Sequence, residues 1–199
     1  MSKTAVIYYS KYGTTRRYAE WIASELGAEL FDARKFKKKD LSRFDTIVYG
    51  GGIYAGGIKG IELITKNWYK GLSEKRVIVF AVGITVESEA CREQCLEVNF
   101  EKRFVTDAAE DAGRDSGQFA LGELLKEKRM PIRCFFLPGA FDPGQIRGMD
   151  KAIMAVTRKM IGSGAHGDSV DGAIAKYMQQ GCDLVDRAAI APVVQAAME

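Results

Sequence analysis

The sequence has little of what marks a disulfide-bonded, secreted or membrane-spanning protein. It contains four cysteines, Cys91, Cys95, Cys134 and Cys182, and no CxxC pair. The first residues lack the basic and apolar pattern of a secretory signal, which favours a reducing, cytoplasmic setting. The longest apolar candidate, AAIAPVVQAAM, contains Pro192 and has about half of the ~20 residues needed to cross a bilayer. We therefore expect no membrane-spanning helix.

Metal ligands are also scarce. The one histidine, His166, stands in the glycine-rich segment GSGAHGDS without companion ligands, whereas zinc takes four. We expect no metal site. Cys91 and Cys95 lie one helical turn apart and would suit a redox pair, but buried packing is the commoner role of a free cysteine.

The charge balance gives no sign of a nucleic-acid partner. Lys and Arg number 29 against 26 Asp and Glu, a net charge of +3, whereas duplex binders concentrate basic residues on one face. The one dense run is RKFKKKD, residues 34–40, which is typical of a solvated connection between two strands. We therefore predict no nucleic-acid binding.

Short apolar runs alternate with segments of helical spacing. The predicted strands are residues 4–9, 28–32, 46–50, 77–82 and 132–137, and the first predicted helices are 19–26, closed by Gly27, then 58–69 and 86–100. Parallel strands need crossover connections, which are usually helical. The pattern predicts an α/β fold, with a doubly wound, five-stranded parallel sheet between two layers of helices.

The length fits one domain over residues 1–199, with an insertion at about 102–130 before the last strand. After that strand, QIRGMDKAIMAVTRKMIG predicts a helix with one apolar face, and a final helix is expected from Asp171. The basic flank of the first of these helices leaves a peripheral membrane contact as an alternative, but a core-facing stripe is the commoner cause of such a pattern.

The segment SKYGTT follows the first strand, where ligands of open α/β sheets bind. Its backbone amides, the hydroxyls of Ser10, Thr14 and Thr15 and the positive end of the next helix form a set of donors for an anion. Taken alone, the segment also fits a simple helix cap provided by Thr14 or Thr15. The neighbouring strand ends must therefore decide between an anion site and a cap.

Two further loops support an anion site that continues into a site for a flat ring. In GGGIYAGG, five of eight residues are glycine and Tyr54 is the single aromatic, so main chain can approach a flat ligand and Tyr54 can stack on it. AVGIT adds Gly83 and the hydroxyl of Thr85 after the fourth strand. A phosphate cup beside a site for a planar ring suits FMN.

The sequence lacks the motifs of other familiar phosphate-binding proteins. There is no GxxxxGK[ST], and no GxGxxG follows the first strand. A GxGxxA match at Gly50, Gly52 and Ala55 follows the third strand with no helix directly behind it, and we interpret it as coincidence. The first strand end lacks the acidic cluster of response regulators.

The loops SKYGTT and GGGIYAGG, together with the spacing of five strands, resemble the flavodoxin family over nearly the whole chain. Within that superfamily, residues 139–162 resemble flavodoxin-type, menaquinone-dependent protoporphyrinogen oxidases. The resemblance implies that the FMN phosphate is held by Ser10, Lys11, Tyr12, Gly13, Thr14 and Thr15. It implies that the isoalloxazine is lined by Gly51, Gly52, Ile53, Tyr54 and Ala55, with Val82, Gly83, Ile84 and Thr85 on its pyrimidine side.

Departures from the family bear on function. Electron-carrying flavodoxins are usually strongly acidic, whereas this chain is mildly basic and its third loop has no aromatic residue. Arg16 and Arg17, close behind the phosphate loop, are expected on the solvent-facing surface of the helix. We expect an FMN-dependent oxidoreductase with no catalytic side chain of its own, acting on a small molecule and passing electrons to a quinone. A carrier that serves redox proteins is the alternative, and the oligomeric state is left open.

Overall fold

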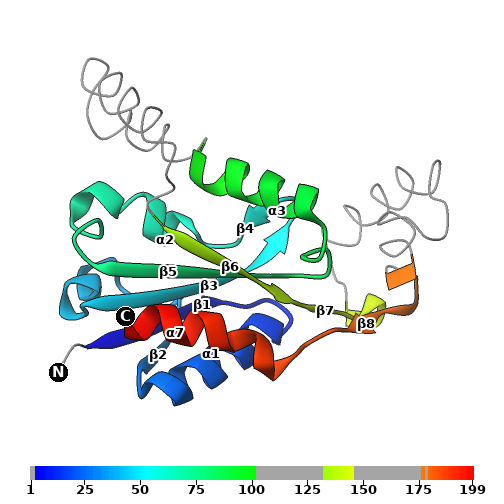
Figure 1. Cartoon of the computed structure of the whole chain (residues 1–199), viewed down its shortest axis with the longest axis horizontal. Coiled ribbons are helices and arrows are strands. Elements are labelled where there is room, and N and C mark those ends of the chain that lie inside the picture. The colour runs from blue at the N-terminus through cyan, green and yellow to red at the C-terminus, as the bar shows by residue number, and fades with distance from the viewer. Residues whose placement is uncertain (1–2, 102–131, 146–175, 178) are drawn as a thin grey trace.

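The computed structural model describes residues 3–101, 132–145, 176–177 and 179–199. Five parallel strands form its central sheet in the order β2-β1-β3-β5-β6 (Figure 1). They are β1 (Thr4–Tyr9), β2 (Glu29–Asp32), β3 (Thr46–Tyr54), β5 (Arg76–Gly83) and β6 (Arg133–Pro138). This order is that of flavodoxin-like doubly wound sheets, so the predicted fold class is confirmed.

Helices cover both faces of the sheet (Figure 1). Helices α1 (Thr14–Leu26) and α7 (Ala191–Met198) pack on one face, where Tyr18, Ile22 and Val193 meet Val48 and Phe80. Helices α2 (Glu62–Thr65) and α3 (Glu89–Leu96) lie over the other face. The strands are buried on both sides, which is why their sequences are continuously apolar.

Helix α1 lies between two glycines with left-handed backbone. Gly13 precedes it at φ 95°, and Gly27 ends it at φ 59°, as predicted from the sequence. Tyr18, Ala19 and Ile22 are fully buried on its inner face. The predicted apolar stripe and the predicted carboxyl cap are therefore confirmed.

The helix predicted over residues 58–69 is wrong. The chain forms strand β4 (Gly57–Ile58), the single turn α2 and a 3-10 turn at Trp68–Lys70. Gly60 and Gly71 have φ of 74° and 108°, which is left-handed backbone that an α-helix does not contain. Gly60 therefore keeps a helix from starting at residue 58, and Gly71 ends the 3-10 turn as its C-cap.

The helix predicted over residues 86–100 is shorter than expected. Helix α3 begins after Ser88, whose Oγ accepts a hydrogen bond from the Cys91 amide at 3.4 Å. It continues into a wider π turn at Glu97–Glu101. A hydroxyl N-cap thus sets the start, which apolar spacing alone does not reveal.

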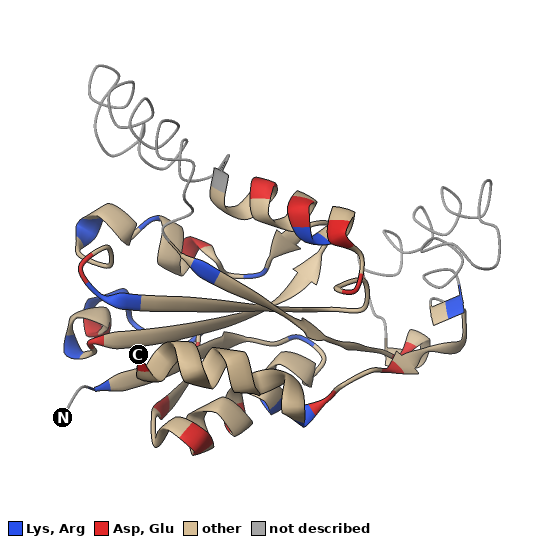
Figure 2. Cartoon of the chain, in the orientation of Figure 1, with Lys and Arg blue, Asp and Glu red and all other residues tan. Residues whose placement is uncertain are grey.

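The carboxyl-terminal part also differs from expectation. The insertion at 102–130, the helix predicted after residue 145 and the predicted helix start at Asp171 lie outside the described residues. The last helix is α7, which follows a two-stranded pair of β7 (Ala140–Phe141) and β8 (Cys182–Asp183). Figure 2 shows no charged residue along α7, whose Val193, Ala196 and Ala197 are buried. None of the helices in the described ranges is long and apolar enough to cross a membrane.

Candidate functional site

The carboxyl ends of the central strands bring the predicted loops to one edge of the sheet. Tyr9 of β1 is paired with Gly51 of β3, and Gly52 is paired with Val82 of β5. Gly83 is paired with Pro138 at the end of β6. Because the strands are parallel and in this register, the chain segments that follow them are neighbours.

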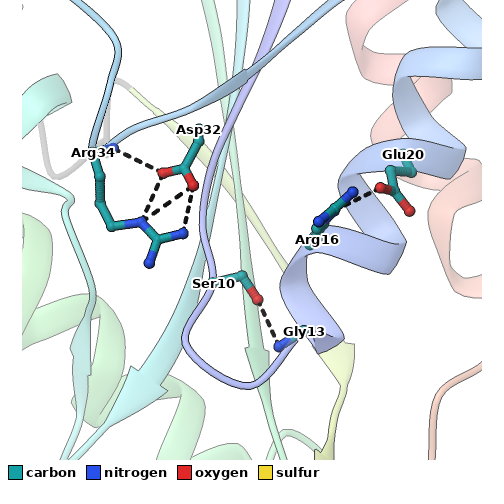
Figure 3. Close-up of polar contacts among 6 residues, drawn as sticks. All are labelled: Ser10, Gly13, Arg16, Glu20, Asp32 and Arg34. Atoms are coloured by element: carbon teal, nitrogen blue, oxygen red, sulfur yellow. Dashed lines mark hydrogen bonds and ion pairs between the residues drawn. The ribbon is translucent and has the colours of Figure 1, made fainter.

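The first of these segments, Ser10–Thr15, forms a turn that we call the cup. The Oγ of the buried Ser10 accepts a hydrogen bond from the Gly13 amide at 3.1 Å, which closes the turn (Figure 3). Gly13 is the N-cap of α1, and no side chain caps this helix end. The first helical turn contains no acidic residue, so the positive end of α1 is available to an anion.

The two threonines of the cup do not occupy the N-cap position. Thr14 and Thr15 are the first two residues of α1 itself, and Thr15 is only 4% exposed. A Cβ added to Gly13 would meet no atom within 4 Å, which shows open space in front of the helix end. The simple cap considered from the sequence is therefore wrong, and the hydroxyls are free of that role.

Arg16 and Arg17 lie on the solvent-facing surface of α1, as expected. Arg16 Nε donates to Glu20 Oε1 at 2.7 Å (Figure 3), and Arg17 Nη1 lies 3.4 Å from Asp183 Oδ2. Each guanidinium has a carboxylate partner on the surface. Neither arginine is needed to explain the cup.

The second segment is a β-hairpin, whereas the sequence predicted a loop after residue 50. Strand β3 continues to Tyr54, Ala55 and Gly56 form the turn, and β4 returns antiparallel with Gly57 opposite Tyr54. Both turn residues have positive φ, 48° and 79°, as in a type I′ turn. Three consecutive glycines before Ile53 and Tyr54 interrupt the apolar pattern, so the sequence did not predict this part of the strand.

The hairpin and the cup are in direct contact. A Cβ on Gly52 would lie 3.6 Å from Thr15 Oγ1 and 3.1 Å from the ring carbon Cε2 of Tyr54. The Tyr54 ring therefore lies over Gly52, beside the cup. The ammonium of Lys59 lies 5.4 Å from the centre of that ring, within cation–π range.

The third segment begins at Gly83. Its carbonyl accepts a hydrogen bond from the Gly139 amide at 2.9 Å, and a Cβ at Gly83 would come within 3.1 Å of Ile53 Cδ1. Thr85 and Gly56 line a cavity of about 50 Å³ that also contacts α3. The cup, the hairpin and this third segment therefore form one continuous surface.

A larger groove of about 860 Å³ runs along α7 past Glu25, near the other end of α1.

Gly50, the first residue of the GxGxxA match, serves the core. It lies inside β3, and a Cβ there would overlap the ring of the buried Phe80. No helix opens behind the match, because β4 follows. Gly50 is therefore a glycine for reasons of core packing, and the GxGxxA match is a coincidence, as interpreted from the sequence.

Sequence reasoning missed the contribution of β2 to the rim of the cup. Asp32 Oδ1 accepts from both the amide and Nε of Arg34 at 2.9 Å (Figure 3), and this bond to Arg34 lowers the pKa of Asp32. The Arg34 guanidinium lies 5.7 Å from the ring centre of Tyr9, the last residue of β1. The run that contains Arg34 was predicted to be solvated, and Arg34 is exposed, so that prediction is confirmed. An aspartate at the end of a strand with an arginine two residues later was the available signal for the pair.

The cysteines are free thiols in the described part of the chain. Burial raises the pKa of Cys95 to about 11, so this thiol is a poor nucleophile and a poor member of a redox pair with Cys91. Over the described ranges, no group of three His, Cys, Asp or Glu residues is placed to hold a metal ion.

These features define a class: a doubly wound α/β protein with an anion cup and a glycine-rich hairpin at the carboxyl edge of its sheet. The family model of the flavodoxin domain matches residues 5–168. The chain belongs to the flavodoxin domain family, and FMN is the cofactor that this membership implies.

Solved structures resemble the chain more distantly. A flavodoxin, WrbA-like protein from Agrobacterium tumefaciens is 22% identical, with 50% of this chain and 69% of that chain covered and a TM-score of 0.40. Flavodoxin 2 from Bacillus cereus is 21% identical, with 49% and 76% covered and a TM-score of 0.37. A flavoprotein from Bacteroides eggerthii is 17% identical, with 78% and 96% covered and a TM-score of 0.37. No curated protein matches the chain in sequence.

The residues present fit FMN on the geometry of the site. The cup offers hydroxyls, backbone amides and an uncapped helix end, which is the donor set that a phosphate monoester requires. Gly52 and Gly83 have no side chains of their own, and Tyr54 and Ile53 pack over them, so the surface beside the cup is aromatic and apolar. Such a surface suits a flat ring.

Proposed function

We propose that the cup and the two neighbouring segments hold FMN, with the phosphate at the start of α1 and the ring between the hairpin and the third loop. The observation that carries this proposal is the uncapped, acid-free start of α1 in front of open space at Gly13. The phosphate-binding residues are Ser10, Lys11, Tyr12, Gly13, Thr14 and Thr15. The ring would contact Gly51, Gly52, Ile53, Tyr54, Ala55, Val82, Gly83, Ile84 and Thr85.

FMN supplies the redox chemistry when it is bound. The chain contributes position and electrostatics. The hydroxyls of Thr14 and Thr15 donate to the phosphate, Tyr54 stacks on the ring, and Gly83 allows backbone to approach the ring edge.

We further propose that the protein is an FMN-dependent dehydrogenase of the protoporphyrinogen oxidase type, which passes electrons to a quinone. Two cations lie near the proposed site: the ammonium groups of Lys11 and Lys59 lie 5.5 and 5.4 Å from the ring centres of Tyr12 and Tyr54, whereas the guanidinium of Arg34 is paired with Asp32. Positive charge favours reduced, anionic flavin and departs from the acidic surface of flavodoxin carriers. The resemblance of residues 139–162 supports the substrate class.

One observation favours the alternative, a carrier of electrons between redox proteins. The cavity between the hairpin, the third segment and α3 measures about 50 Å³, and a carrier needs no substrate pocket. The two functions differ in whether a small molecule is turned over.

Steady-state turnover separates them. The FMN-loaded protein is mixed with protoporphyrinogen and a menaquinone analogue without oxygen, and protoporphyrin fluorescence is followed. We expect fluorescence to rise with enzyme and quinone, and to stay flat with a Thr14→Ala/Thr15→Ala variant that has lost FMN. Absence of turnover with several quinones, while the reduced protein still passes single electrons to a haem protein, would establish the carrier.

A further inference from the structure

Asn99 is the most deeply buried polar side chain that the structure describes outside the strands, with no exposed surface. It lies in the π turn Glu97–Glu101 that follows α3. Its Oδ1 accepts a hydrogen bond from the Ile58 amide at 2.8 Å, and its Nδ2 donates to the carbonyls of Gly56 and Cys95 at 2.7 and 2.6 Å. One amide therefore joins the tip of the hairpin to the end of α3.

The base and the tip of the hairpin are held by different contacts. At the base, the Lys59 amide donates to Gly52 O at 3.0 Å, and the hydroxyl of Tyr49 donates to Lys59 O at 2.7 Å. At the tip, the bonds from Asn99 reach Gly56 and Ile58, on the two sides of the returning strand's first residue. The tip thus depends on a residue 41 positions further along the chain than Ile58.

The turn needs this support because its backbone is strained. Ala55 is the one non-glycine residue with positive φ in the described part of the chain, and a side chain in this conformation costs free energy. Strained backbone persists where surrounding contacts over-determine it, and such places cluster at ligand sites. Asn99 supplies contacts of this kind.

The π turn explains how Asn99 reaches the hairpin. An α-helix that continued unchanged past Leu96 would rotate the following side chains differently, whereas the wider turn places Asn99 over Cys95 and toward Gly56. Single π turns at the end of an α-helix are frequent at functional sites. Helix geometry and hydrogen bonding therefore point to the same residue.

We propose that Asn99 is a positioning residue for the flavin: by holding Gly56 and Ile58 it fixes Tyr54, and so sets the affinity and the midpoint potential of FMN. Tyr54 is paired with Gly57 across the hairpin, so a change in the tip moves its ring. This inference rests on the proposed placement of FMN. It assigns to Asn99 no contact with the flavin itself.

The main test compares Asn99→Ala with Asn67→Ala. Asn67 is a matched control because its Nδ2 also donates to the carbonyl four residues earlier, Leu63 O at 2.9 Å, without touching the hairpin. Asn99→Ala removes all three hydrogen bonds of Asn99, and we expect the FMN dissociation constant to rise by roughly tenfold, because FMN must then order a loosened hairpin tip. If oxidised and reduced flavin differ tenfold in that effect, the two-electron midpoint potential shifts by about 30 mV. Asn67→Ala is expected to leave both quantities at wild-type values.

A second variant and a flavin-free measurement guard against loss of folding. Asn99→Asp keeps the volume and the acceptor for the Ile58 amide, but its carboxyl can donate at most one hydrogen bond, to Gly56 O or Cys95 O, in place of the two that Asn99 donates. In the protein without FMN, amide hydrogen exchange of Ile58 should be slow in wild type and in Asn67→Ala, and faster in Asn99→Ala. If Asn99→Ala does not fold, Asn99→Asp is used for the affinity and the potential.

The outcomes are distinct. Wild-type protein that fails to bind FMN refutes the proposed function and this inference with it. If FMN binds but the Asn99 variants match Asn67→Ala in affinity and potential, the inference is wrong and the proposed function stands. Fast amide exchange at Ile58 in the wild-type protein also refutes the proposal that Asn99 holds the hairpin tip. The inference is supported if the Ile58 amide exchanges more slowly in wild type than in Asn99→Ala and if the variant also shows the shifts in FMN affinity and midpoint potential.

Discussion

The cup and the hairpin lie side by side, yet they are built in different ways. The cup is closed by a bond between Ser10 and Gly13, three residues apart, and continues directly into its own helix. The tip of the hairpin is held by Asn99, which lies more than forty residues away. The proposed phosphate site is thus encoded in one short stretch of sequence, whereas the proposed wall for the ring depends on a distant element.

This difference has a physical consequence. Local contacts form with little loss of chain entropy, because few residues separate the partners, whereas distant contacts require the sheet to form first. We expect changes in the cup to affect FMN through its phosphate, and changes in the hairpin to affect FMN through the position of Tyr54. Three predictions test this contrast, beginning with the largest effect.

Removing both hydroxyls of the cup should have the largest effect. Each hydrogen bond to a charged group contributes about 1.5 to 3 kcal/mol, so Thr14→Ala/Thr15→Ala should weaken FMN binding by roughly a hundredfold to ten-thousandfold. The measurement is a titration followed by flavin fluorescence. Exchange of the Ile58 amide in the flavin-free protein should not change, because the hairpin does not depend on the cup.

The matched control for that variant is Lys37→Ala/Lys38→Ala, in the charged run and away from the cup. We expect FMN affinity close to that of wild type. A loss as large as that of the threonine variant would mean that general charge, and not the hydroxyls, holds the phosphate.

A smaller effect is expected at Gly13. Its φ of 95° is unfavourable for any side chain, so Gly13→Ala should lower the free energy of unfolding by about 1 to 2 kcal/mol and also weaken FMN binding. Gly71→Ala is the control, since Gly71 has φ 108° and no atom within 4 Å of an added Cβ. Urea unfolding should show similar losses for both variants, but only Gly13→Ala should affect FMN. Equal FMN affinity in the two variants would contradict the role of the cup.

The smallest effect is expected in the hairpin turn. Ala55→Gly removes the cost of a left-handed alanine but adds freedom to the unfolded chain, so the free energy of unfolding should rise by at most about 1 kcal/mol. Ala188→Gly, at an exposed position whose φ is not positive, should lower it. Both values come from urea unfolding. A loss at Ala55 as large as that at Ala188 would show that the turn is unstrained.

The same contrast explains what the sequence could predict. The strands β1, β2, β5 and β6 were predicted within one residue at each end, because fully buried parallel strands are continuous apolar runs. The extension of β3 to Tyr54 was missed, since three glycines interrupt its apolar pattern. A conformation that depends on contacts made by Asn99 has no local signal around Tyr54.

The residues of the site follow the same rule. Ser10 to Thr15 were predicted from a short motif, and the structure places them together at the start of α1. Arg34 was missed because a run of basic residues is usually solvated, and only the fold brings its guanidinium to Tyr9. Asn99 was missed because one asparagine in a helical segment carries no signal until its partners are known.

The packing of Phe80 against Gly50 has a consequence for how this sequence can vary. The tip of the ring occupies the space that a side chain at position 50 would take. Positions 50 and 80 are therefore linked as a small and large pair, 30 residues apart, and neither can be exchanged freely alone. Among relatives of this chain, a larger residue at position 50 should occur together with a smaller one at position 80, so the two positions should covary.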